Sequence, residues 1–327
     1  MTLLPSRRRM LAALLALCAA PVGAQTFPER PITLVVGFSA GGGVDVVGRI
    51  LAELLTAQLK TTVVVENRTG FSGNLAAQQV KRAAPDGYTL LMAPTSSYAM
   101  TVKLLGAAAA GYELVPDFKA VATVAELPLV LLASRAAGIG SLEQLSKMAK
   151  AAPGKLAYGS TGNGSTEHVV TESFRALAGI ELLHVPYRGS SPAMGDLQSG
   201  QIQLMFTTPP TALSNVQGGR AVALGAASRS RLSVLPDVPT LAEQGLPYEA
   251  ASIYAVLAPK TTPDAVVARL NQALQEGLKS ADIRKKLNQL GVEVIQATPA
   301  ESATRLSAEV DKWGKAIDAA NIRKDKE

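Results

Sequence analysis

Short apolar stretches rich in β-branched residues alternate along this chain with longer stretches whose apolar positions recur at helical spacing. Residues 32–36 predict a buried strand, and residues 46–60 follow with apolar side chains three and four positions apart. Further strands are predicted at residues 62–66, 88–92, 127–133, 156–160, 182–187, 202–207 and 292–296. Most are followed by a predicted helix. This alternation predicts an α/β fold with parallel sheets and right-handed crossovers.

A glycine-rich turn joins the first predicted strand to its helix. Gly41, Gly42 and Gly43 lie in this turn, and Asp45 follows them. Glycine allows positive φ and a close approach to the main chain. The free N–H groups and the dipole of the helix that follows favour an anion. From this pattern alone, a turn in which glycine serves only tight backbone geometry explains the three glycines as well as an anion site does.

The first 24 residues predict a secretory signal peptide. Arg7–Arg9 precede an apolar run at residues 10–20, and Val22 and Ala24 supply small residues before the expected cleavage point. The arginines also resemble a twin-arginine signal, so the general secretory route and the twin-arginine route are both open. Cleavage removes Cys18, the only cysteine in the sequence. We expect an exported protein without disulfides, thiolate metal sites or a lipid anchor.

Charge and composition exclude further classes of protein. The formal charge of +6 falls to +3 when the three arginines of the signal are removed. Because the remaining cations form no stripe interleaved with aromatic residues, we expect no nucleic-acid binding. A hydrophobic content of 47% is enough for a large core in two lobes. No later apolar run is long enough to span a membrane.

The predicted strand ends carry small, neutral, polar residues. They are Ser39, Gly41, Gly42, Thr95, Ser96, Ser160, Thr161, Asn163, Thr207 and Thr208. Catalysis would place titratable groups there, whereas His168 and His184 are predicted inside a helix and a strand without metal-ligand spacing. No nucleophile elbow, phosphate-binding loop or dinucleotide fingerprint is complete. We expect a binding protein that is not an enzyme and uses no metal or cofactor.

Eight short motifs follow one another along the chain. They are Pro28–Ile32, Ala40–Asp45, Val65–Arg68, Ala84–Leu91, Tyr158–Gly164, His184–Gly189, Leu235–Thr240 and Ala258–Pro259. Each motif alone is weak evidence for membership of any family. Together, and in this order, they resemble the substrate-binding receptors of tripartite tricarboxylate transporters, which form the TctC or Bug family of periplasmic solute-binding proteins.

The resemblance implies a two-lobed periplasmic binding protein fold of type II-like topology, with the ligand cleft between the lobes. Residues 25–122 and 250–327 would form the first lobe, and residues 123–249 the second. The lobes would close like a hinge on one small carboxylate. The resemblance also implies a periplasmic monomer that delivers its ligand to membrane permease subunits.

The resemblance further implies the ligand-binding residues. The loops Phe38–Gly42 and Ser160–Asn163 would grip the carboxylate from opposite lobes, largely through backbone groups, and other loops would contact the rest of the ligand. The complete expected set is Phe38, Ser39, Ala40, Gly41, Gly42, Asn74, Thr95, Ser96, Ser160, Thr161, Asn163 and Thr207. Asp45 is expected to accept hydrogen bonds from loop N–H groups.

Departures from the family pattern bear on the ligand. Thr207 stands where many members have aspartate, so an ammonium group would lack its obvious counter-charge. A dicarboxylate or an aromatic carboxylate is therefore expected. Phe71 could stack on an aromatic ligand or only pack on the surface. Because a fold alone fixes no function, a ligand-sensing receptor for a signalling partner and an exported enzyme on the same fold stay as alternatives.

Overall fold

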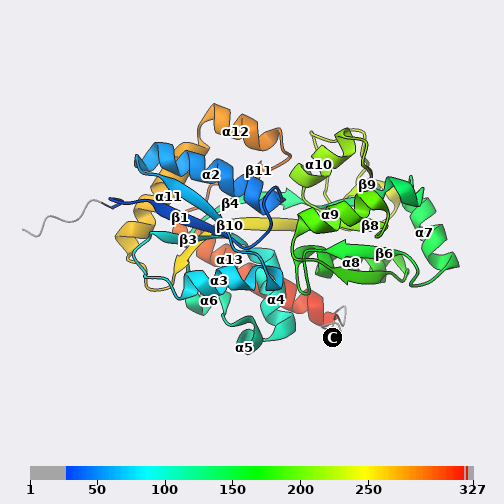
Figure 1. Cartoon of the computed structure of the whole chain (residues 1–327), viewed down its shortest axis with the longest axis horizontal. Coiled ribbons are helices and arrows are strands. Elements are labelled where there is room, and N and C mark those ends of the chain that lie inside the picture. The colour runs from blue at the N-terminus through cyan, green and yellow to red at the C-terminus, as the bar shows by residue number, and fades with distance from the viewer. Residues whose placement is uncertain (1–26, 320–321, 323–327) are drawn as a thin grey trace, which may run out of the picture.

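The computed structural model describes residues 27–319 and residue 322, so the expected signal peptide at residues 1–24 lies outside the described residues. Within the described residues, a pair of β-sheets flanked by helices forms two lobes that lie side by side (Figure 1). The second lobe is the green half of the chain, and the C-terminal helices lie with the N-terminal strands on the first lobe. The predicted two-lobed α/β fold is confirmed.

The sheet of the first lobe has six strands in the order β11-β4-β10-β3-β1-β2. Their bounds are β1 (Ile32–Val36), β2 (Val63–Asn67), β3 (Thr89–Pro94), β4 (Phe118–Pro128), β10 (Ala251–Pro259) and β11 (Glu293–Val294). β1 pairs in parallel with β2 and β3, whereas β10 runs antiparallel between β3 and β4. The carboxyl ends of β1 and β3 therefore meet at one edge, which faces the second lobe.

The sheet of the second lobe has five strands in the order β7-β6-β8-β5-β9. Their bounds are β5 (Val130–Ser134), β6 (Ala157–Ser160), β7 (Leu183–Pro186), β8 (Leu204–Thr207) and β9 (Ala221–Ala226). β6 is parallel to β7 and β8, and β5 is antiparallel to β8 and β9. The carboxyl ends of β6 and β8 carry the predicted residues Ser160 and Thr207.

Helices cover both sheets (Figure 1). Those of the first lobe are α2 (Gly43–Leu59), η1 (Phe71–Gly73), α3 (Asn74–Lys81), α4 (Thr95–Leu105), α5 (Ala107–Ala110), α6 (Leu114–Asp117), α11 (Asp264–Leu278), α12 (Ala281–Asn288) and α13 (Pro299–Ala319). Those of the second lobe are η2 (Arg135–Ala137), α7 (Leu142–Ala151), α8 (Thr166–Ala178), α9 (Ser190–Ser199), α10 (Pro209–Gln217) and η3 (Ala242–Gln244). Among the residues described, no helix has the length and apolar character needed to cross a membrane.

The chain crosses between the lobes at two hydrogen-bonded segments. β4 stays in the first sheet to Pro128 and β5 begins at Val130, so the boundary expected between residues 122 and 123 falls inside β4. The first crossing is Leu129. Its backbone N–H donates to Ala250 and its carbonyl accepts from Ala227, at 2.9 and 2.8 Å. These bonds tie the outgoing and returning segments together where the chain passes between the lobes.

A close contact between α2 and α11 leads to a stability prediction. A Cβ atom on Gly277 would lie 2.2 Å from Cγ of Leu54, which is buried in this interface. We therefore expect Gly277→Ala to lower the free energy of unfolding by about 1 to 2 kcal/mol, because the leucine must leave its packed position. Gly314→Ala in α13 is the control, since no atom lies within 4 Å of its added Cβ. Urea unfolding should separate the two variants, and equal stabilities would contradict the packing argument.

Candidate ligand-binding site

A polar cavity lies between the two lobes. The first lobe lines it with Phe38, Gly42, Gly43, Val44, Pro94, Ser97, Ser252 and Tyr254, and the second lobe with Thr161, Thr166, Glu167, Ser190, Thr207 and Thr208. The cavity itself is small, about 20 Å³, and the wider atom-free space of about 370 Å³ includes open solvent, so the lobes must move apart to admit a ligand. Glycine, serine and threonine supply most of this surface, in agreement with the neutral polar strand ends that the sequence predicts.

Five helices begin at this cavity. The residues that precede the first turns of α2, α4, α8, α9 and α10 are Gly42, Pro94, Ser165, Gly189 and Thr208. The first-turn N–H groups of a helix have no partner within the helix, and its dipole places partial positive charge there. Within the described residues no lysine or arginine lines the cavity. The arrangement therefore attracts an anion through backbone dipoles rather than through a cationic side chain.

Two of the buried hydroxyl groups that lack a hydrogen-bond partner among the described residues belong to the cavity. Ser97 Oγ and Thr166 Oγ1 both belong to residues that line the cavity, and each residue is only 2% exposed. Buried polar atoms in folded proteins almost always bond to protein, water or ligand. These two hydroxyls are thus available to a molecule held between the lobes.

Hydrogen bonds join the lobes around the cavity. Ser191 Oγ donates to the Ala40 carbonyl at 2.9 Å, and Ser72 Oγ donates to the Asn163 carbonyl at 2.8 Å. On α4, Thr101 Oγ1 donates to the Gly164 carbonyl at 3.0 Å. The structure therefore shows the lobes closed on each other.

The glycine turn allows this closure. A Cβ on Gly43 would lie 2.1 Å from Thr208 Oγ1 of the second lobe, and one on Gly42 would lie 2.5 Å from Ser190 Oγ. Gly41 has φ of +78° but no atom within 4 Å of an added Cβ. Tight geometry therefore explains Gly41, whereas close approach between the lobes requires Gly42 and Gly43.

Asp45 holds the turn in place, as the sequence predicts. Its Oδ2 accepts from the Gly41 backbone N–H and from Arg49 Nε, both at 2.9 Å, and its Oδ1 accepts from Asn67 Nδ2 at 2.8 Å. Asn67 also donates to the Phe38 carbonyl at 3.0 Å. Burial acts to raise the pKa of Asp45, but these hydrogen bonds outweigh it and hold the pKa below its ordinary value.

Four of the twelve predicted residues line the cavity, namely Phe38, Gly42, Thr161 and Thr207. Others support its walls. Ser39 and Ala40 bond Ser191 across the lobes, and Asn163 accepts from Ser72. Gly41 bonds Asp45, and Ser160 Oγ lies 2.6 Å from His184 Nε2. Both predicted loops reach the cavity, and each bonds another segment of the opposite lobe, at Ser191 for the first loop and at Ser72 for the second.

The side chains of three other predicted residues form hydrogen bonds within the first lobe and do not line the cavity. Thr95 Oγ1 donates to the Ile253 carbonyl, and Ser96 Oγ donates to a carboxylate oxygen of Glu309 on α13. Asn74 Oδ1 accepts from Tyr112. Because α4 already begins at Thr95, its helical rotation turns Ser97 rather than Thr95 or Ser96 toward the cavity.

Several residues of the site were not predicted from the sequence. They are Gly43, Val44, Pro94, Ser97, Thr166, Glu167, Ser190, Ser252 and Tyr254, together with Thr208, which was noted only as a strand end. Of these, Thr166 and Glu167 lie nearest to the predicted loop on the second lobe, three and four residues after Asn163. Ser252 and Tyr254 lie on β10, a strand that was not predicted either.

The two histidines support the second-lobe loop. The rings of His168 and His184 stack with centroids 4.1 Å apart, and His184 also stacks on Tyr158. His168 Nδ1 accepts from the Gly164 N–H at 3.1 Å. Both rings thus contribute to packing, and neither lines the cavity. No cluster of potential metal ligands occurs within the described residues.

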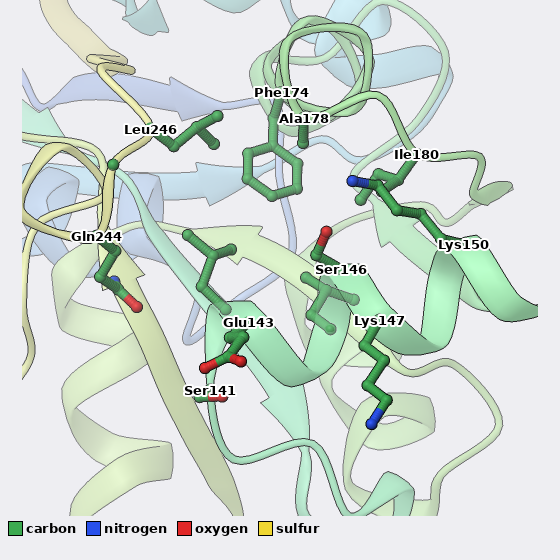
Figure 2. Close-up of a pocket in the computed structure, with 13 residues that line it drawn as sticks. Ser141, Glu143, Ser146, Lys147, Lys150, Phe174, Ala178, Ile180, Gln244 and Leu246 are labelled. Atoms are coloured by element: carbon green, nitrogen blue, oxygen red, sulfur yellow. The ribbon is translucent and has the colours of Figure 1, made fainter.

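A larger hollow lies on the second lobe, away from the predicted loops. It is formed by α7, the end of α8 and the segment after η3, and Figure 2 shows Phe174 pointing into it with Lys147 and Lys150 projecting from α7. Its exposed lining is mainly apolar, and none of the twelve predicted residues lines it. The hollow offers neither the convergent helix ends nor the unpartnered hydroxyls of the cavity between the lobes.

A two-lobed fold closed over an anion-attracting cavity defines the class of solute-binding proteins. The family model described as "Tripartite tricarboxylate transporter family receptor" matches residues 47–322, and the chain belongs to this family. The predicted family is thereby confirmed. The members are receptors, so the chain is a binding protein and not an enzyme.

Similar proteins with known sequences or structures support this family assignment. The chain is 35% identical over 296 residues to Protein BugT of Bordetella pertussis (strain Tohama I), and the match covers 90% of each chain. The structure of Rpa4515 of R. palustris with adipate has a TM-score of 0.86 at 33% identity and covers 91% of this chain and 99% of that one. MatC of Rhodopseudomonas palustris with bound malate has a TM-score of 0.83 at 31% identity and covers 89% and 100%.

Proposed function

We propose that this receptor captures a small carboxylate between its two lobes and delivers it to the permease subunits of a tripartite tricarboxylate transporter. The observation that carries the proposal is the convergence of five helix N-termini on one polar cavity that both lobes line. Such a site binds a carboxylate through backbone N–H groups. The similar receptors with adipate and malate support a carboxylate ligand.

The proposal also includes the place of action. The predicted signal peptide would export the chain to the periplasm, by the general secretory or the twin-arginine route. There a monomer would bind its ligand and carry it to the membrane.

The finer class of ligand depends on one residue that was not predicted from the sequence. From Thr207 alone, a dicarboxylate or an aromatic carboxylate is expected, because that position supplies no negative charge for an ammonium group. Glu167 supplies a carboxyl group in the same cavity. Phe71 is 47% exposed and does not line the cavity, so it offers no stacking surface for an aromatic ring there.

A thermal-shift screen of the mature protein against small carboxylates tests the proposal. A ligand that binds only the folded state stabilises it by about 2.7 kcal/mol at a concentration one hundred times its Kd. We expect at least one carboxylate to raise the melting temperature, and calorimetric titration to saturate at one site without product formation. The matched control is the neutral amide of the same compound, which lacks the anion. Equal binding of the amide would contradict capture through the helix N-termini.

A further inference from the structure

Glu167 places one carboxyl group in a cavity otherwise lined by neutral residues. It is the second residue of α8, and Thr161 Oγ1 donates to its Oε2 at 2.7 Å. Among the residues that the structure describes, it is the one charged residue lining this cavity. The first turn of α8 and the threonine hydroxyl both favour its charged form.

The surroundings of Glu167 supply hydrogen bonds but no cationic side chain. Burial raises its pKa, and the bonds from Thr161, its own backbone N–H and Ser165 offset this only in part, so the pKa of Glu167 stays above its ordinary value. The other titratable group lining the cavity is the Tyr254 phenol. Its pKa is raised, first by burial and then by the negative charge of Glu167, so the phenol keeps its proton. When Glu167 is ionised, the residues that line the cavity supply it with no cationic partner, so a ligand ammonium group would be its counter-charge.

The charge balance of the closed cavity discriminates between ligand classes. The partial positive charge at the helix N-termini can balance the negative charge of one ligand carboxylate. A dicarboxylate would bring a second negative charge into a closed space that already contains Glu167, and like charges at close range disfavour each other. An ammonium group beside the ligand carboxylate would instead pair with Glu167 through a charge-assisted hydrogen bond.

We propose that Glu167 is a specificity-determining residue that selects small amino carboxylates, in which an ammonium group lies beside the captured carboxylate. The inference rests on the proposed function of the cavity and deepens it. The counter-charge that Thr207 does not provide at the end of β8 is supplied from the first turn of α8. Glu167 and Thr207 line the same cavity, so either position can face a ligand held there.

The test compares matched pairs of compounds that differ in the ammonium group. Calorimetric titrations use aspartate against succinate, alanine against propionate, and phenylalanine against 3-phenylpropionate, with malate and lactate as hydroxyl-bearing analogues. In at least one pair we expect the wild-type protein to bind the amino compound about tenfold or more tightly than its partner. Glu167→Gln keeps the size and an acceptor oxygen, and should weaken the amino compound about tenfold or more while binding of the plain carboxylate is retained or improved.

Glu143→Gln is the matched control, since Glu143 is the exposed second residue of α7 on the same lobe and lies outside the cavity. It should leave every affinity unchanged. Equal or tighter binding of the plain or hydroxyl-bearing acid in every pair that binds would overturn the inference and leave carboxylate capture intact. Failure of every carboxylate to bind would instead overturn the proposed function. The wild-type comparison needs no substitution, so it decides the question even if Glu167→Gln does not fold.

Discussion

Gly43→Ala is expected to abolish ligand capture while both lobes remain folded. The added Cβ would lie 2.1 Å from Thr208 Oγ1, which belongs to the opposite lobe. Rotation of the Thr208 hydroxyl relieves this contact only in part, because Thr208 Cβ lies 3.1 Å from the same position, so the lobes close less fully where the helix N-termini converge. Since enclosure of the ligand is lost, we expect its affinity to fall about a hundredfold or more, in line with the loss of several desolvated polar contacts.

Calorimetric titration measures the loss of ligand binding, and thermal unfolding of the free protein measures any loss of stability. The free variant should melt close to the wild-type temperature, because the conflict arises only between lobes. Gly195→Ala in α9 is the control, because it adds a methyl group on the second lobe where no atom lies within 4 Å. Wild-type affinity in Gly43→Ala would show that closure at this turn is not needed for binding.

Asp45→Ala is expected to destabilise the first lobe by about 2 kcal/mol, a typical cost of leaving buried donors without their acceptor. The change leaves the Gly41 N–H, Asn67 Nδ2 and Arg49 without their shared acceptor. Urea unfolding at pH 7 measures the loss. The control is Asp311→Asn, an exposed acid on α13, which should stay within about 0.5 kcal/mol of the wild-type protein.

The same network makes a pH-dependent contribution. The pKa of Asp45 in the folded protein lies below its ordinary value of 3.8, so the carboxylate stabilises the fold above that pH. The contribution is lost as the pH falls through the lowered pKa of the folded state. The stability difference between wild type and Asp45→Ala should therefore shrink at strongly acidic pH. A difference that stays constant from pH 7 to below pH 3.8 would contradict the ionised state of Asp45.

Local pattern was enough to predict the α/β class, the turn before α2 and the role of Asp45. Each depends on neighbours close in the sequence, such as the N–H of Gly41 four residues before Asp45. The predicted strand 127–133 is different, because its continuous apolar run divides at Leu129 into strands of two sheets. Apolar periodicity reports burial but not the sheet to which a residue belongs.

Long-range pairing explains most of the site that sequence reasoning missed. β10 enters the first sheet between β3 and β4 and brings Ser252 and Tyr254 to the cavity from a distant segment of the chain. The choice of Ser97 over Ser96 depends on helical rotation at one boundary residue, which a sequence pattern does not resolve to a single position. The strand-end pattern does not identify Glu167, because this residue lies in the first turn of the helix that follows the strand.

Capture of one carboxylate between the lobes, by converging helix N-termini, can be seen directly in a crystal structure. The crystals would be grown from the mature protein with the tightest-binding carboxylate from the screen. We predict the ligand carboxylate within hydrogen-bonding distance of the backbone N–H groups at Gly43 and Val44, with the lobes closed over it. A ligand bound in the hollow beside α7, with no ligand between the lobes, would contradict this mode of capture.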